Sequence, residues 1–99
     1  MRGTEFSMVF DAAGLPDRLI VRGRKTGDRF TPFGAPGSKS VKKFLIDQQI
    51  PRWKRNQIPV VLAGAEILWL VGLRRAEGHR VTAATRQIVE FHATPLSEF

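Results

Sequence analysis

The sequence predicts a small α+β domain in which short strands stand before and after a pair of helices. The chain has 99 residues, which suits a single domain with a modest core. Apolar residues make up 42% of it, an ordinary share for a globular protein. Strand-like runs lie towards both ends and helical spacing falls between them, an order that does not suit an alternating parallel sheet.

The first part of the chain contains two predicted strands and a loop. Met8–Phe10 is a short apolar run that predicts an edge strand. After a turn over Asp11–Pro16, Arg18–Arg24 alternates between two faces and predicts a strand whose second half shows arginines to solvent. A turn around Gly27 and a proline- and glycine-rich loop over Phe30–Ser38 follow.

Two helices are predicted next. Ser38 or Ser40 can cap the first, which ends near Gln48. Helical spacing turns three apolar residues to the core (Val41, Phe44 and Leu45) and four charged residues away from it (Lys39, Lys42, Lys43 and Asp47). Pro51 suits the first position of a second, short helix that runs to about Asn56.

The last part reads as strands again. Val60–Ala63 and Glu66–Val71 predict a hairpin with its turn at Gly64, and the second strand is apolar on both faces, as a central strand is. Gly72–Gly78 is predicted as a polar loop, and Arg86–His92 contains the last strand.

The domain boundaries follow from the two ends. Residues 1–6 read M-R-G-T-E-F, which is typical of a leader encoded by a cloning vector. We therefore expect one domain over residues 7–93 and a frayed tail over 94–99. The sequence contains no cysteine and no apolar run long enough to cross a bilayer, so disulfides, a cysteine zinc site and membrane insertion are not expected.

The charge is concentrated in one segment. The net charge is +7, and between residues 22 and 55 ten basic residues face only Asp28 and Asp47, an excess of eight. The ten are Arg22, Arg24, Lys25, Arg29, Lys39, Lys42, Lys43, Arg52, Lys54 and Arg55. A basic excess on one stretch indicates an anionic partner.

Gly34–Ser40 reads G-A-P-G-S-K-S, which only loosely resembles a nucleotide-binding loop. Aligned on its Lys-Ser pair, that motif would need glycines where Phe33 and Ser38 stand, so no ATP site is expected. Lysines in the first turn of a helix oppose the helix dipole, and a phosphate there would satisfy both. The sequence leaves two interpretations open for Lys39, Lys42 and Lys43: a phosphate site or a solvated face.

Several other residues have both a structural and a functional interpretation. The arginines around Gly27 favour phosphate contact over a purely solubilising edge, and Asp28 suits a backbone-bonding role in the turn. Trp53 favours anchoring its helix to the core over stacking on a base. His79 and His92 have no partner ligands at useful spacing, so neither a metal site nor a catalytic triad is predicted.

Four stretches of the sequence form an ordered pattern. They are L-I-V-R-G-R-K-T-G-D-R-F-T-P-F-G (Leu19–Gly34), G-S-K-S-V-K-K-F-L-I-D (Gly37–Asp47), I-P-R-W-K-R-N-Q-I-P-V-V (Ile50–Val61) and I-L-W-L-V-G-L-R (Ile67–Arg74). Together with V-F-D-A-A-G-L-P (Val9–Pro16), this pattern resembles the C-terminal domain of bacterial tRNA(Ile)-lysidine synthetases over most of the chain.

The resemblance implies a function that composition cannot show. That family attaches lysine to the wobble cytidine of an isoleucine tRNA, and an N-terminal domain with a Ser-Gly-Gly-x-Asp-Ser loop uses ATP and magnesium for this step. No such loop occurs here, so the resemblance implies no catalysis and no cofactor for this chain alone. It implies that this domain holds tRNA(Ile) near the acceptor stem, beside the parent's catalytic domain in a bacterial cytoplasm, and it allows a homodimer of the parent.

The resemblance also implies a fold and a set of contacts. The fold would be a small β-sandwich-like domain with two short helices, related to a domain of the phenylalanyl-tRNA synthetase β chain. The expected tRNA contacts are Arg22, Arg24, Lys25, Arg29, Lys39, Lys42, Lys43, Arg52 and Arg55. Two positions depart from the family pattern, because Lys25 stands where arginine is common and Ser40 where a second lysine is common.

A different class of function is compatible with the same charge. The domain would then be a protein-interaction or scaffolding module whose basic surface docks on an acidic partner. A steep dependence of tRNA binding on salt distinguishes the first class from the second.

Overall fold

The computed structural model describes residues 6–94 and confirms the α+β class, with eight strands and two short helices in that range. The predicted leader and tail lie outside the described residues, except for Phe6 and Thr94. Neither helix in this range is long and apolar enough to span a membrane. The predicted relation to a domain of the phenylalanyl-tRNA synthetase β chain stays a prediction.

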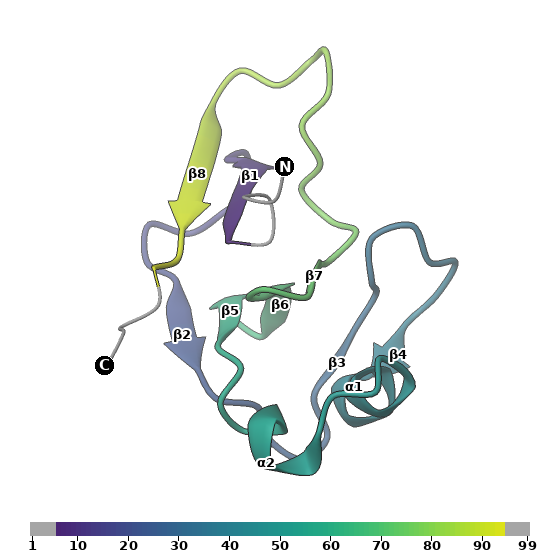
Figure 1. Cartoon of the computed structure of the whole chain (residues 1–99). Coiled ribbons are helices and arrows are strands. Elements are labelled where there is room, and N and C mark those ends of the chain that lie inside the picture. Colours follow the sequence, from purple (N-terminus) through teal and green to yellow (C-terminus); the bar gives the residue numbers. More distant parts are fainter. Residues whose placement is uncertain (1–5, 95–99) are drawn as a thin grey trace.

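A sheet of four antiparallel strands forms the centre of the fold (Figure 1). In spatial order the strands are β2 (Ile20–Arg22), β5 (Val60–Ala63), β6 (Glu66–Leu70) and β7 (Arg74–Arg75). Gly64, whose φ is 60°, makes the tight turn between β5 and β6. β6 has a neighbour on each side and buries four of its five residues, so the predicted central strand is confirmed.

A β-bulge sets which side chains face each side of this sheet. Val61 pairs with Trp69 but Leu62 pairs with Ile67, so Leu68 is the extra residue on β6. As a result Leu68 and Trp69 both contribute to one core cluster, while Leu62 and Ile67 belong to the other. The sheet thus divides the core into two parts.

Helix α1 (Val41–Asp47) covers one face of the sheet. It buries Val41, Phe44 and Leu45, as predicted, and the Phe44 ring meets Phe30 edge-on at 5.2 Å between centroids. Of the two predicted caps the structure uses Ser40, whose Oγ accepts a hydrogen bond from the Lys43 amide at 3.0 Å. The short ribbon of β3 (Arg29–Phe30) and β4 (Lys39–Ser40) leads into the helix and encloses the predicted loop.

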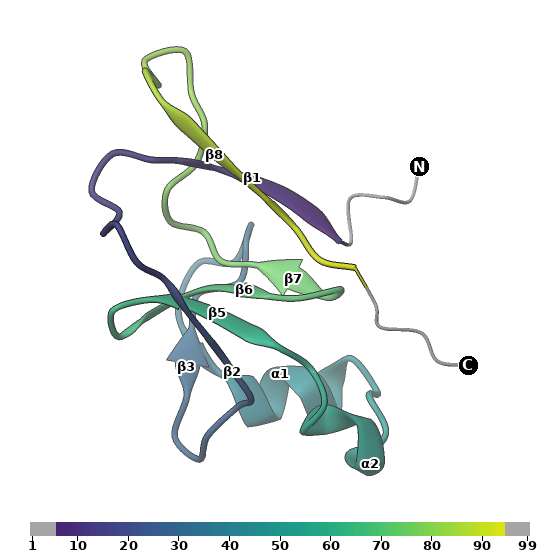
Figure 2. The same ribbon diagram turned by 90° about the vertical axis from the view of Figure 1, so that its left-hand side faces the viewer.

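A two-stranded ribbon covers the opposite face (Figure 2). It consists of β1 (Ser7–Asp11) and β8 (Ile88–His92), both predicted, paired antiparallel. Phe10 is fully buried beneath it, with its ring 5.5 Å from that of Phe91. The domain therefore has three layers: the ribbon, the central sheet, and α1.

Helix α2 (Arg52–Arg55) differs from the prediction in two respects. Pro51, predicted as the first helical residue, is its N-cap, so the helix begins one residue later than expected, and it buries none of its residues. Trp53 is 70% exposed, so the prediction that it anchors the helix to the core is wrong. A single turn has no buried face of its own, and the flanking Ile50 and Ile58 attach the segment to the core instead.

Two strand predictions are also corrected. The segment predicted as a polar loop contains β7, because Leu73 and Ala76 on either side of its two arginines pack into the core and the strand bonds to the edge of β6. In β2 the exposed side chains are Ile20 and Val21 rather than arginines. Arg22 is turned inwards, towards Asp28.

Candidate nucleic-acid interface

The basic segments gather at one end of the molecule. The β2–β3 turn, α1 and α2 lie together in both views, at the end opposite the β1–β8 ribbon (Figures 1 and 2). One hydrogen bond joins the turn to α1, because the Val41 amide donates to the Asp28 carbonyl at 2.9 Å. Gly23, just after β2, lies close to Asn56 at the end of α2, since a Cβ added at Gly23 would be 3.6 Å from the Asn56 carbonyl oxygen. Basic residues that are far apart in sequence therefore share one surface.

Asp28 organises the turn after β2. Its carboxylate accepts two hydrogen bonds from the Arg22 guanidinium, at 2.9 and 3.0 Å, and one from the Lys25 amide at 2.8 Å. The hydrogen bonds from Arg22 lower the pKa of Asp28 below its usual range. This confirms the structural role predicted for Asp28, and it explains why Arg22 turns away from solvent, with 23% of its side chain exposed.

Asp47 plays a similar part at the end of α1. It pairs with Lys39 at 3.2 Å and with Lys43 at 3.6 Å, and the hydrogen bond from Lys39 lowers its pKa. All three side chains are exposed by more than a third, so these pairs are weak and open to competition from an anionic ligand. Both acids of the segment are thus occupied, and three of its ten cations are paired.

The other seven cations have no carboxylate partner among residues 6–94. They are Arg24, Lys25, Arg29, Lys42, Arg52, Lys54 and Arg55. Arg29 donates to the Ser38 hydroxyl at 3.1 Å, and Arg55 donates through Nε to the Ile50 carbonyl at 2.9 Å. Lys54 belongs to this set although we had not predicted it as a contact. Its position between other basic residues in P-R-W-K-R could have indicated that it belongs to the same basic surface.

A polar notch of about 270 Å³ lies where the turn meets α1. Three of the unpaired cations line it together with two hydroxyls and the turn: Arg24, Lys25, Thr26, Gly27, Asp28, Ser40 and Lys42. The Nε of Arg24 is buried and has no hydrogen-bond partner among the described residues. A buried donor without an acceptor costs free energy, and the cations and hydroxyls that line the notch suit an anion.

Arg75 serves the fold rather than this surface. Arg75 donates to the backbone carbonyls of Ala76, Val9 and Gly78 at 2.8, 2.9 and 2.6 Å. Its guanidinium also lies 4.3 Å from the centre of the Phe10 ring. Arg75 therefore links the ribbon to the edge of the central sheet, and its substitution should affect folding.

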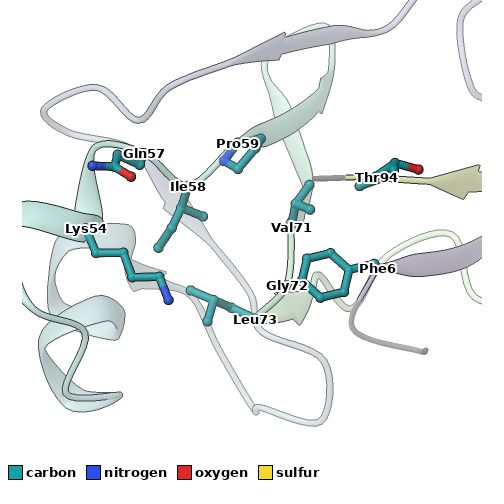
Figure 3. Close-up of a pocket in the computed structure, with 10 residues that line it drawn as sticks. Phe6, Lys54, Gln57, Ile58, Pro59, Val71, Gly72, Leu73 and Thr94 are labelled. Carbon is teal, nitrogen blue, oxygen red and sulfur yellow. The ribbon is translucent and has the colours of Figure 1, made fainter. Parts of the chain in front are cut away.

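A hollow between the end of α2 and the β6–β7 turn offers little chemistry. It measures about 550 Å³ (Figure 3). Lys54 extends across it towards Leu73, and it is the one titratable side chain among the residues that line it. The hollow lacks the pairs of acids, bases or nucleophiles that catalysis needs.

One row of side chains has the composition of a catalytic triad. On the β1–β8 ribbon, Ser7 Oγ lies 3.0 Å from His92 Nδ1, and His92 Nε2 lies 3.2 Å from a Glu90 oxygen. His92 and Glu90 are 63% and 54% exposed, so water competes for each bond and no buried carboxylate orients the ring. The third histidine-bearing pair, His79 with Glu66, lies elsewhere at 3.1 Å.

The comparisons with known proteins agree with the sequence pattern. The family model described as the TilS substrate C-terminal domain matches residues 19–91. The chain belongs to this family. Over 90 residues it is 39% identical to a tRNA(Ile)-lysidine synthase of Caldanaerobacter subterraneus subsp. tengcongensis, and over 77 residues 43% identical to one of Geobacter sulfurreducens.

The alignments cover 91% and 78% of this chain but 19% and 16% of those relatives, so the chain spans about a fifth of their length. A solved structure titled "Crystal structure of TILS C-terminal domain" superimposes with a TM-score of 0.72 at 26% identity. The match covers 96% of this chain and 76% of that one. The TilS C-terminal domain thus accounts for almost the whole described fold.

Proposed function

We propose that this TilS C-terminal domain binds tRNA(Ile) through the basic end formed by the β2–β3 turn, α1 and α2. The observation that carries the proposal is the segregation of charge. Both acids of the segment are used in local ion pairs, which leaves seven unpaired cations on one end of the molecule. A surface of that sign and density suits a polyphosphate backbone.

The side chains of this surface suit a helical region of RNA. The deep, narrow major groove of an RNA helix hides its base edges, so proteins grip phosphates and 2′-hydroxyls instead. The notch offers cations and hydroxyls on one side, and α2 offers exposed Arg52 and Lys54 on another. We propose the acceptor-stem region as the part of the tRNA that is held.

The proposed role in the whole protein is affinity and orientation. The relatives are named as tRNA(Ile)-lysidine synthases and are about five times longer than this chain. In the parent, a separate N-terminal domain would attach lysine to the wobble cytidine using ATP and magnesium, in the cytoplasm of a bacterium. This domain would hold the substrate at a distance from that reaction.

Filter binding with the 99-residue chain tests the proposal. We expect tRNA binding to weaken steeply as salt rises, because each neutralised phosphate releases counterions. An acceptor-stem hairpin should bind more tightly than an anticodon-stem hairpin with the same number of phosphates. Absence of salt-sensitive tRNA binding would favour the protein-interaction class, and equal binding of the two hairpins would refute the acceptor stem as the site.

A further inference from the structure

Trp53 is an exposed aromatic ring without a neighbour to cover it. At 70% exposure, no large apolar side chain among the described residues is more exposed. Five phenylalanine rings in this range each lie against another ring or a guanidinium: Phe10, Phe30, Phe33, Phe44 and Phe91. No such pair involves Trp53 within residues 6–94, and the other tryptophan, Trp69, is buried in the core.

The surroundings of Trp53 are strongly basic. Arg52 and Lys54 beside it are both exposed, and no acidic residue occurs in the sequence between Asp47 and Glu66. Gly23 lies close to the Asn56 carbonyl, which places the end of β2 near α2, so the notch lined by Arg24 begins close to this helix. The ring therefore stands at the edge of the same basic surface.

An exposed aromatic ring between two cations indicates what kind of partner this surface can bind. An apolar protein surface would have to bury the lysine and arginine next to the ring, and charged residues are depleted from the centres of protein interfaces for that reason. A nucleotide presents a flat aromatic face and an adjacent phosphate, and so complements both features of α2. Tryptophan stacking on a base beside cations is the usual way in which proteins hold single-stranded nucleic acid.

We infer that Trp53 stacks on an unpaired nucleobase while Arg52 and Lys54 contact the flanking phosphates, an inference that rests on the proposed function. Inside a duplex each base is covered on both faces by its neighbours and only a terminal pair leaves one face open, so a single-stranded nucleotide is the partner that offers Trp53 an unpaired base. The domain would then hold a junction, with the duplex phosphates at the notch and the first unpaired nucleotides at α2. This assigns the domain a preference for duplex ends that carry a single-stranded extension.

Two RNA probes test this inference: a blunt duplex, and the same duplex with a short single-stranded extension at one end. Binding of each to the 99-residue chain is followed by filter binding and by tryptophan emission. Trp69 is 1% exposed and supplies a constant background, so a change in emission reports Trp53. We expect quenching and tighter binding with the extended duplex, and little quenching with the blunt one.

Two substitutions separate stacking from other roles. Trp53→Leu should lower affinity for the extended duplex roughly tenfold, the typical effect of losing one stacked base, and leave the blunt duplex unaffected. Trp53→Phe should keep most of the preference, because phenylalanine still offers a ring. Circular dichroism should show both variants folded, since the side chain is exposed.

The outcomes are distinct. Stacking is refuted, while the proposed function stands, if two results occur together. Trp53→Leu binds both probes as tightly as the unaltered chain does, and the emission of the unaltered chain is not quenched by either probe. Equal losses for both probes would also overturn the inference, because they indicate a general contact. If neither probe binds at any salt concentration, the proposed function fails, and the inference fails with it.

Discussion

Removing two cations from the notch should change the salt dependence of tRNA binding by a calculable amount. The substitutions are Arg24→Gln and Lys42→Gln, on the turn and on α1. Each phosphate contact contributes about 0.9 units to the slope of log affinity against log salt. Losing both should therefore flatten the slope by about 1.8 units.

The seven unpaired cations set the scale of the slope for the unaltered chain. If all of them meet phosphates, the slope is about 6.3 units, and affinity falls roughly 6,000-fold from about 50 to 200 mM salt. With five contacts the slope is about 4.5 units and the same change of salt costs roughly 500-fold. The difference is large enough for filter binding across a salt series to measure.

The matched control removes the same net charge elsewhere. Arg18 and Arg86 are exposed and lie outside the basic end, before β2 and before β8. Arg18→Gln with Arg86→Gln should leave the slope within a few tenths of a unit of the unaltered chain. If this control loses as much affinity and slope as the notch pair, binding is diffuse attraction to net charge and the proposed surface is wrong.

Four other predictions follow from the contacts. Asp47→Asn should strengthen tRNA binding and steepen its salt slope by up to about two units, because it frees Lys39 and Lys43; an unchanged slope in filter binding would show that neither lysine meets a phosphate. Arg75→Gln should destabilise the domain by roughly 2–4 kcal/mol in urea unfolding, because the part-buried carbonyls of Ala76 and Gly78 lose their donor; a change below about 0.5 kcal/mol would contradict its structural role. Arg22 lowers the pKa of Asp28, so this carboxylate stabilises the fold above its unfolded-state pKa of about 3.9, and the stabilisation disappears as pH falls through the lower folded-state pKa. Urea unfolding across pH should therefore show a smaller loss of stability in acid for Asp28→Asn than for the unaltered chain, and equal losses would exclude this pair as the cause. Calorimetric titration of the chain with magnesium-ATP should give no saturable heat, because the Gly34–Ser40 loop lacks the glycines of a nucleotide-binding loop; a micromolar site would contradict this.

Sequence periodicity was enough to locate the main elements. The apolar spacing of Val41, Phe44 and Leu45 placed α1, and the two candidate caps, Ser38 and Ser40, limited its start to a few residues before the structure selected Ser40. The continuous apolar run of β6 identified the central strand. These features depend on local backbone preference and on burial of one face, and the pattern of neighbouring residues in the sequence indicates both.

The short elements could not be predicted in the same way. β7 consists of two arginines, and its pairing depends on the edge that β6 presents from elsewhere in the chain. Trp53 was expected inside because large aromatic side chains bury well, yet α2 is a single turn that Ile50 and Ile58 already attach to the core. Local sequence does not show that the space beneath a residue is already filled.

The sequence predicted which basic residues form the candidate site, but not which of them are paired with acids. Nine basic residues were expected to contact tRNA alike, and the structure separates them by their partners. Arg22 and Asp28 are six residues apart and meet only because the turn brings the chain back. Lys39 lies eight residues from Asp47 and reaches it from the strand before the helix. Charge counts along the sequence cannot distinguish a paired cation from an unpaired one.

The ion pairs matter for the surface that they leave behind. The fork between Arg22 and Asp28 closes the turn, and the carboxylate also receives the Lys25 amide, so the backbone that carries Arg24 and Lys25 is held in one conformation. The Asp28 carbonyl in turn receives the first amide of α1, which fixes the helix that carries Lys42. Cations held on an ordered frame lose less conformational entropy when they meet phosphates than cations on a mobile loop. Under the proposed function, Arg22 would therefore act on RNA binding by positioning its neighbours, and the two acids of this otherwise basic segment would help to form the binding surface.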